Sequence, residues 1–264
     1  MKIVDFHTHA FPDSLAPVAM GRLADGSHEY APHHDGTIAS LLRSMDESGI
    51  WSSVICSIAT KPSQERPILE WSRQIVSDRI FPFISLHPEG TDHNALLDEA
   101  RNAGIRGAKF HCMYQGFKAD DEHALPIFEK LAARNMLALF HAGRDIRWPK
   151  SDVASPERLL NLHRRVPELC LVTAHTGGWL LWDEVEALLA GTQVIFDTSF
   201  TLGHITPEAW SRIWAKHSHD RIVFGSDSPW ASQKAALDDL RQAIPDDLEF
   251  EKVVSLNARR ILGA

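Results

Sequence analysis

The sequence is poor in several features that would each indicate a particular class of protein. It has only three cysteines in 264 residues, Cys56, Cys112 and Cys170. Because three is an odd number and each lies in or beside an apolar run, we expect reduced core residues and no disulfide framework. No apolar run approaches the roughly 20 residues of a membrane-spanning helix. No charged leader precedes the first predicted strand, which favours a cytoplasmic protein.

Basic residues are also scarce. Lys and Arg number 27 against 35 Asp and Glu, which gives a formal net charge of −8. A chain that tracks a phosphate backbone needs the opposite balance, so a nucleic-acid partner is disfavoured. We expect a small-molecule substrate, no nucleic acid and no membrane partner, and we leave assembly into a homo-oligomer open.

The chain alternates between strand-like and helix-like segments along its whole length. Apolar runs predict eight strands, at residues 3–9, 53–58, 80–86, 105–111, 137–141, 169–175, 194–197 and 222–227. Amphipathic helical segments separate them, as at 38–49. Eight such units favour an α/β fold, a single-domain (β/α)₈ TIM barrel over residues 1–264. The alternative, an open doubly wound sheet, would need a glycine-rich phosphate turn after the first strand, and the sequence has none.

Residues 10–36 form the one long irregular stretch, rich in Pro, Gly, His and Asp. Loops of this length inside compact domains are usually functional. We therefore expect a lid-like loop at about 10–36.

Residues of one chemical type fall at the predicted strand ends. Asp5, His7 and His9 share one face of the first strand, because side chains on a strand alternate. His141 ends the fifth strand, His175 the sixth and Asp227 the eighth. In such a barrel the C-terminal strand ends converge on the active site.

Three imidazoles and a carboxylate suit a zinc-type ion with one position open for water. Such an ion lowers the pKa of the water toward about 7. A neighbouring imidazole and carboxylate can then move its proton. The chain has 15 histidines, so their position and not their number carries this hypothesis.

Four short motifs carry a family resemblance. They are Asp-Phe-His-Thr-His at 5–9, Phe-His-Ala-Gly at 140–143, His-Thr-Gly-Gly at 175–178 and Gly-Ser-Asp-Ser-Pro-Trp at 225–230. Together with residues 257–262 they resemble the amidohydrolase superfamily. The most similar branch is the amidohydrolase 2 group, which includes aminocarboxymuconate-semialdehyde decarboxylase-like enzymes.

The resemblance implies a metal-dependent barrel enzyme. It implies that His7, His9, His141 and Asp227 bind a divalent ion, with zinc as the first choice and manganese as the alternative. Asp227 would also accept a proton, and His175 would be catalytic, polarising the substrate or orienting the water. One ion per chain is favoured over two.

Lys109 decides between two kinds of site, because family members differ on the fourth strand. A carbamylated lysine bridges two metals in some members, whereas a free ammonium would repel them. Lys109 shares a strand face with His111, and we favour a free amine that holds a substrate carboxylate.

Further residues at the same barrel end are candidates for substrate binding. Arg144 follows a predicted ligand by three residues and could clamp a carboxylate, although a surface ion pair is an equal alternative. The full set of predicted substrate-binding residues is Lys109, His111, Arg144, Trp148, His204 and Trp230. The two tryptophans suit an apolar wall but also simple packing.

The leading hypothesis is metal-dependent hydrolysis of a small carboxylate-bearing ester, lactone or amide. A second is non-oxidative decarboxylation or hydration of an unsaturated or aromatic acid. A third, a TatD-like nuclease, is disfavoured by the acidic charge balance. A catalytically inactive binding barrel would leave converging polar groups buried without compensation.

Overall fold

A computed structural model describes residues 1–24 and 31–263 of the chain. Part of the lid-like loop expected at about 10–36, residues 25–30, lies outside the described residues. Within the rest of that stretch, residues 16–24 form the helix α1 and not an irregular loop. Its sequence, Ala-Pro-Val-Ala-Met-Gly-Arg-Leu-Ala, has a proline in the first turn, where the missing N–H costs nothing.

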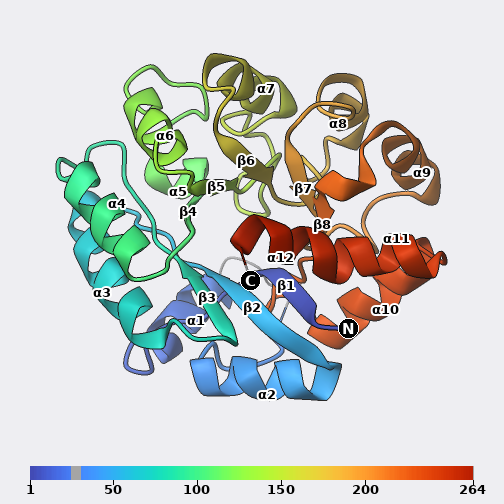
Figure 1. Cartoon of the computed structure of the whole chain (residues 1–264), viewed down its shortest axis with the longest axis horizontal. Helices are drawn as coiled ribbons and strands as arrows, with labels where there is room; N and C mark the ends of the chain where they lie inside the picture. The colour runs from blue at the N-terminus through green and yellow to red at the C-terminus, as the bar shows by residue number, and fades with distance from the viewer. Residues whose placement is uncertain (25–30, 264) are drawn as a thin grey trace.

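Within the described residues, eight parallel strands form the barrel, as the sequence predicts (Figure 1). They are β1 Ile3–Thr8, β2 Ile50–Cys56, β3 Ile80–Phe83, β4 Gly107–Phe110, β5 Leu137–Phe140, β6 Cys170–Thr173, β7 Ile195–Asp197 and β8 Ile222–Val223. The strands pair in two sheets. One has the order β1-β2-β3 and the other the order β4-β5-β6-β7-β8. A bridge between Ile84 and Ala108 connects the two sheets, and one between Thr8 and Ser228 closes the ring.

Helices surround the strands in the order of the chain (Figure 1). They are α1 Ala16–Ala24, α2 Ile38–Ser48, α3 Glu65–Ile75, α4 His93–Asn102, α5 Cys112–Gln115, α6 Leu125–Ala132, α7 Pro156–Arg165, α8 Trp182–Leu188, α9 Pro207–Lys216, α10 Gln233–Ala243, α11 Asp247–Glu251 and α12 Asn257–Leu262. Ser155 and Thr206 cap the N-termini of α7 and α9, because each side chain accepts a backbone N–H three residues on. No helix in the described part of the chain is long and apolar enough to cross a membrane.

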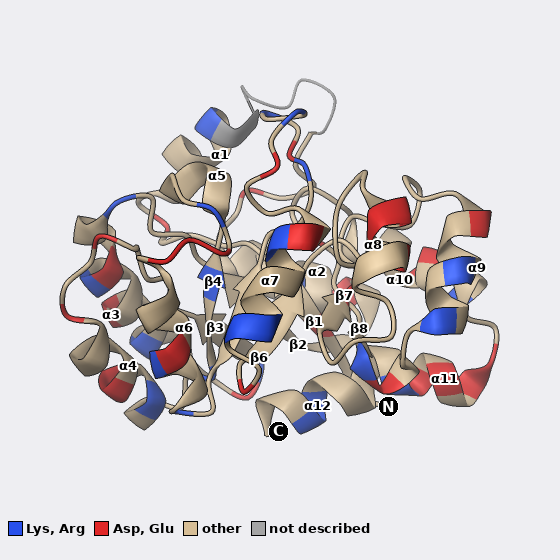
Figure 2. Ribbon diagram, turned by 90° about the horizontal axis from the view of Figure 1, so that it is seen from above, with Lys and Arg blue, Asp and Glu red and all other residues tan. Residues whose placement is uncertain are grey.

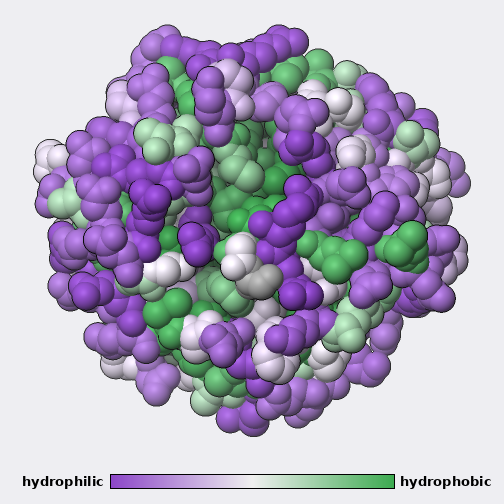
Figure 3. Space-filling model, in the orientation of Figure 1, coloured by the Kyte–Doolittle hydropathy of each residue, from purple (hydrophilic) through white to green (hydrophobic). Residues whose placement is uncertain are grey.

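The two ends of the barrel differ. Helix α12 and the chain termini lie at one end, and α1 and α5 lie at the other (Figure 2). Figure 3 looks onto the α12 end, where hydrophilic residues dominate and apolar residues gather in a hollow beside the helix. The site described below is at the opposite end, where the strands terminate.

The carboxylate of Asp5 joins the first strand to the last. It is fully buried and accepts hydrogen bonds from the Ser226 N–H (2.9 Å), the Ser226 hydroxyl (2.6 Å) and the Gln233 side-chain amide (2.8 Å). Burial raises the pKa of Asp5 to about 6 against the effect of these bonds. Asp5 thus ties β1 to the segment that follows β8.

His217, at the end of α9, is buried away from that site. Its ring stacks on Phe196 with centroids 4.0 Å apart, and its Nδ1 accepts the Gly191 N–H at 3.1 Å. Burial lowers the pKa of His217 to about 4. The native chain therefore keeps this imidazole neutral at pH values where an unfolded chain protonates it.

This difference in the pKa of His217 between the folded and the unfolded chain predicts that His217 lowers the stability of the protein in acid. Between pH 6.5 and pH 4 the unfolded chain binds one proton more at this position, so the free energy of unfolding falls as the pH falls. The contribution amounts to about 2 kcal/mol between pH 8 and pH 5. His217→Gln keeps a hydrogen-bond acceptor but does not titrate. Its free energy of unfolding, measured by urea denaturation, should therefore fall by about 2 kcal/mol less than that of the wild type between pH 8 and pH 5. His123→Gln, at an exposed loop position, is the control, and an unchanged drop in His217→Gln would contradict the prediction.

Candidate metal centre

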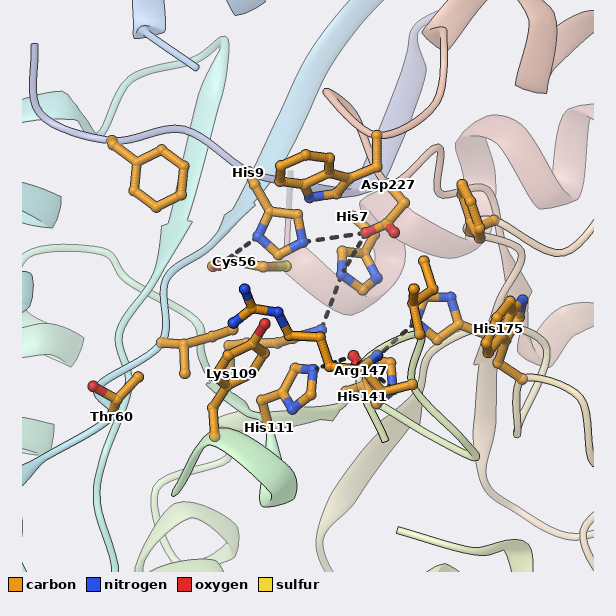
Figure 4. Close-up of a pocket in the computed structure, with 18 residues that line it drawn as sticks. His7, His9, Cys56, Thr60, Lys109, His111, His141, Arg147, His175 and Asp227 are labelled. Carbon is orange, nitrogen blue, oxygen red and sulfur yellow. Dashed lines mark hydrogen bonds and ion pairs between the residues drawn. The ribbon is translucent and has the colours of Figure 1, made fainter. Parts of the chain in front are cut away.

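A pocket of about 250 Å³ opens at the C-terminal ends of the strands (Figure 4). Eight of the sequence-predicted site residues line it, namely His7, His9, Lys109, His111, His141, His175, Asp227 and Trp230. The strand ends therefore bring together residues that are up to 223 positions apart in the sequence, as a parallel barrel requires.

Two imidazoles enter the pocket from β1. The Nδ1 of His7 donates to Asp197 Oδ2 at 2.9 Å, and the Nδ1 of His9 donates to the Cys56 carbonyl at 3.0 Å. These acceptors carry no proton of their own, so each neutral ring has its lone pair on Nε2. Both Nε2 atoms face Asp227, at 3.4 Å from His7 and 3.2 Å from His9.

Asp227 follows β8 in a constrained backbone. Its φ is 70°, in the left-handed region that costs a non-glycine residue energy and is often found at functional sites. Two residues earlier, a side chain on Gly225 would place its Cβ 2.9 Å from the His7 Cβ, so glycine permits this close approach. Burial raises the pKa of Asp227, but the hydrogen bond with His9 and the charges of His7 and His9 outweigh it, and the pKa lies well below its usual value.

His141 and His175 face each other from β5 and β6. The Nε2 of His141 donates to the Arg144 carbonyl and the Nδ1 of His175 donates to the Ser199 carbonyl, both at 2.9 Å. The remaining nitrogens, His141 Nδ1 and His175 Nε2, lie 3.1 Å apart. Burial lowers the pKa of His175 to about 4, with the His141 charge adding to the effect. Burial, followed by the charge of His111, also lowers the pKa of His141.

The chemistry of this donor set fits a divalent metal ion. Two imidazole nitrogens with lone pairs face a carboxylate, and two more face each other at 3.1 Å. Lone pairs at such distances repel unless they share a cation. Their second nitrogens are fixed by a carboxylate or a backbone carbonyl, the arrangement that orients histidine ligands in metal sites.

The potential ligands fall into two groups. The ligand atoms of His7, His9 and Asp227 lie within 4.8 Å of one another, as do those of His111, His141 and Asp145. The structure therefore places His141 with His111, whose ring stacks on it at 4.1 Å, and not within the first group. Its Nδ1 nevertheless points away from the second group, toward His175.

Lys109 lies deeper than a substrate clamp would. Its side chain is 1% exposed, and its Nζ donates to the Nε2 of His7 at 2.9 Å. Burial lowers the pKa of this amine. The amine thus occupies the lone pair that His7 would offer to a metal.

Three predicted substrate-binding residues do not line the pocket. Arg144 is exposed, because its backbone N–H pairs with the Trp179 carbonyl and the chain turns the side chain outward. Trp148 packs edge-on against Tyr114 outside the pocket wall. His204 stacks on Phe200, which itself lines the pocket. Their role in substrate binding stays a prediction.

Several residues at the site were not predicted. Asp197 ends β7, Ser199 lies two residues beyond it, and together they hold His7 and His175 in place. Asp197 ended a predicted strand and so had the same positional signal as Asp227. Arg147 and Tyr114 line the pocket from loop and short-helix positions that no periodicity marks.

The comparisons with known proteins agree with this geometry. A family model described as amidohydrolase matches residues 4–264. A probable 2-pyrone-4,6-dicarboxylic acid hydrolase from Acinetobacter baumannii, solved with citric acid bound, is 18% identical with a TM-score of 0.72, and 100% of both chains is covered. A dihydroxybenzoic acid decarboxylase from a Polaromonas species, solved with manganese and the inhibitor 2-nitroresorcinol, is 15% identical with a TM-score of 0.75, covering 99% of this chain and 97% of that one.

A third structure is 5-carboxyvanillate decarboxylase from Sphingomonas paucimobilis, 14% identical with a TM-score of 0.70 and 99% of each chain covered. At these identities the likeness concerns the fold. The search of curated proteins found no match.

The donor set predicts the metal content of the protein. We expect about one zinc or manganese ion per chain after reconstitution and dialysis, measured by elemental analysis. His9→Gln should lose it, because one nitrogen donor is gone, whereas His33→Gln, at an exposed position, should not. Lys109→Met should also keep it, since a protonated amine offers no lone pair. Two ions in the wild type and one in Lys109→Met would instead indicate a carbamylated bridging lysine.

Proposed function

The chain belongs to the amidohydrolase family of metal-dependent enzymes, and from that premise we propose that it hydrolyses a small ester, lactone or amide that bears a carboxylate. One observation carries the proposal. The Nε2 atoms of His7 and His9 and the Asp227 carboxylate converge at the floor of a pocket too small for a polymer.

We assign the metal to His7, His9, His141 and Asp227. The His141 Nδ1 faces His175 and would have to turn toward the first group to bind the ion. Nitrogen and carboxylate ligands suit zinc, and they also suit manganese, which one structural neighbour contains. When bound, the ion supplies Lewis acidity and lowers the pKa of a water molecule. One ion per chain is favoured, because a second ion would need Lys109 as a carbamylated bridge, whereas its amine donates to His7.

The remaining steps belong to side chains of this protein. The depressed pKa of Asp227 keeps it ionised at neutral pH, so it can accept a proton. His175 is neutral at the same pH and its Nε2 faces the pocket, so it can accept a hydrogen bond from water and orient it. Ser199 fixes the other side of the His175 ring.

Two features support an acidic substrate. The pocket wall is largely apolar, but its lining includes the cations Lys109 and Arg147. One structural neighbour is named for a dicarboxylic acid and was solved with citric acid. The Lys109 amine, which donates to His7, favours a negative charge at the pocket floor. His111 and Trp230 are the other predicted substrate-binding residues that line the pocket.

A turnover screen tests the proposal. Zinc- and manganese-loaded protein would be assayed against lactones, carboxylated esters and amides, with release of carbon dioxide measured in parallel on unsaturated and aromatic acids. Hydrolysis that needs the metal is the expected result. Carbon dioxide release without hydrolysis would replace the proposal by its alternative.

That alternative is non-oxidative decarboxylation or hydration of an unsaturated or aromatic acid. It is favoured by the structural neighbours named as decarboxylases of hydroxylated aromatic acids. Both reactions would use the same metal, His175 and Asp227, so only the products separate them. A nuclease remains disfavoured, because the pocket is small and the chain is acidic.

The role of His175 predicts a split between binding and catalysis. His175→Asn should retain the metal and lower kcat by roughly a hundredfold or more, as expected for a lost acid or base. The measurements are kcat and metal content on the same sample. Simultaneous loss of the metal would reassign His175 as a ligand, next to His141.

A further inference from the structure

Arg147 lines the pocket from the loop after β5, at a position that nothing in the sequence marks (Figure 4). Its side chain is exposed, whereas the other lining cation, Lys109, is buried at the floor against His7. Arg147 is therefore the lining cation that solvent can reach. Among the described residues no carboxylate forms an ion pair with its guanidinium.

The loop holds Arg147 in a defined place. Its backbone N–H donates to the Asp145 side chain at 2.7 Å, and the Trp148 N–H donates to the Asp145 carbonyl at 3.0 Å. These bonds form a turn in which an aspartate side chain fixes the backbone two residues on. The same carboxylate lies 3.3 Å from His111 Nε2 and ties the turn to β4. The Asp145 carboxylate thus already has partners, the Arg147 backbone N–H and His111.

The Arg147 guanidinium has more N–H donors than the contacts among the described residues use. One Nη2 N–H is given to the Arg22 carbonyl in the last turn of α1, at 2.9 Å, and the Tyr114 phenol lies beside the group. A guanidinium carries five N–H donors in a planar fork that matches a carboxylate. Arg147 and Tyr114 together form a polar patch on an otherwise apolar wall.

We propose that Arg147 is the specificity-determining residue of the pocket, binding a carboxylate of the substrate at the mouth while the reacting group lies at the floor beside His7, His9 and Asp227. This inference rests on the proposed function for the idea that the substrate is an acid. It adds the residue that recognises the acid. It also implies a substrate with two polar ends separated by an apolar body. The wall between them includes Phe11, Ile58, Ile146, Trp179 and Phe200.

The volume of the pocket limits the size of the apolar part of the substrate. A cavity of about 250 Å³ is smaller than the roughly 300–1,000 Å³ of sites for drug-sized ligands. It suits a single ring or a short chain with two polar substituents. The expected class is a small diacid or an acid-substituted ester or lactone.

Calorimetric titration of the zinc-loaded protein with two probes tests the proposal without any turnover. The probes are benzene-1,3-dicarboxylate and 1,3-diacetylbenzene, which has the same shape but no carboxylate and no hydrolysable bond. Arg147→Gln is the main variant, because its amide keeps hydrogen-bond donors but carries no charge. Arg147→Lys keeps a charge, and Arg144→Gln is the matched control from the same loop, outside the pocket.

We expect wild-type protein to prefer the diacid over the uncharged 1,3-diacetylbenzene. Arg147→Gln should weaken diacid binding by about ten- to a hundredfold, the loss of one charge-assisted contact. It should change the binding of 1,3-diacetylbenzene by less than about threefold. Arg147→Lys should recover part of the diacid affinity, and Arg144→Gln should match the wild type.

Equal weakening of both probes in Arg147→Gln would mean that the residue only supports α1, and would overturn the proposal. A wild-type protein that binds the diacid no better than 1,3-diacetylbenzene, or an Arg144→Gln variant with the same loss, would overturn it too. Because these are binding measurements, they separate this inference from the reaction type. A failed turnover screen with an intact diacid preference would reject the proposed reaction and keep the role of Arg147.

Discussion

The buried carboxylate of Asp5 is the contact on which the site depends. A parallel barrel has to bring its first and last strands together, and here β8 spans only Ile222–Val223. Its continuation is held by the hydrogen bonds that Ser226 donates to Asp5. Asp227 is the next residue, so these bonds, together with the bridge between Thr8 and Ser228, also set the distance between Asp227 and the imidazoles of His7 and His9. Loss of this carboxylate would leave several buried donors unsatisfied, which costs more than a typical hydrogen bond contributes.

A second layer of acceptors fixes the imidazole tautomers. Asp197, the Cys56 carbonyl and the Ser199 carbonyl each take one ring N–H, so His7, His9 and His175 direct their lone pairs into the pocket. All three acceptors belong to strand ends or to residues next to them. The metal-type character of the pocket is therefore a property of the strands, since the ladders that position the ligands also position the groups that orient them.

The strands and the residues at their ends could be predicted from the sequence, because a period-two pattern and a turn mark each of them. His7, His141, His175 and Asp227 all occupy the pocket on this basis. Arg144 and Arg147 show where such reasoning fails. Both are three residues or more beyond the strand, and the Asp145 turn decides that Arg147 faces the pocket and Arg144 faces solvent. No periodicity records a turn of this kind, and α1 likewise lay inside a stretch that composition marked as irregular.

The pocket thus has two parts with different physical support. Each ligand at the floor lies in a strand or shortly after one and is fixed by a hydrogen bond or a close charged partner, so its position tolerates little change. Arg147 at the mouth is held by one aspartate turn and one contact to the α1 carbonyl of Arg22. A substitution in the loop after β5 can therefore alter which acid is recognised without disturbing the donor set below. The asymmetry also explains why the family resemblance, which rests on residues at strand ends, identifies a metal-dependent barrel enzyme but leaves the substrate undetermined.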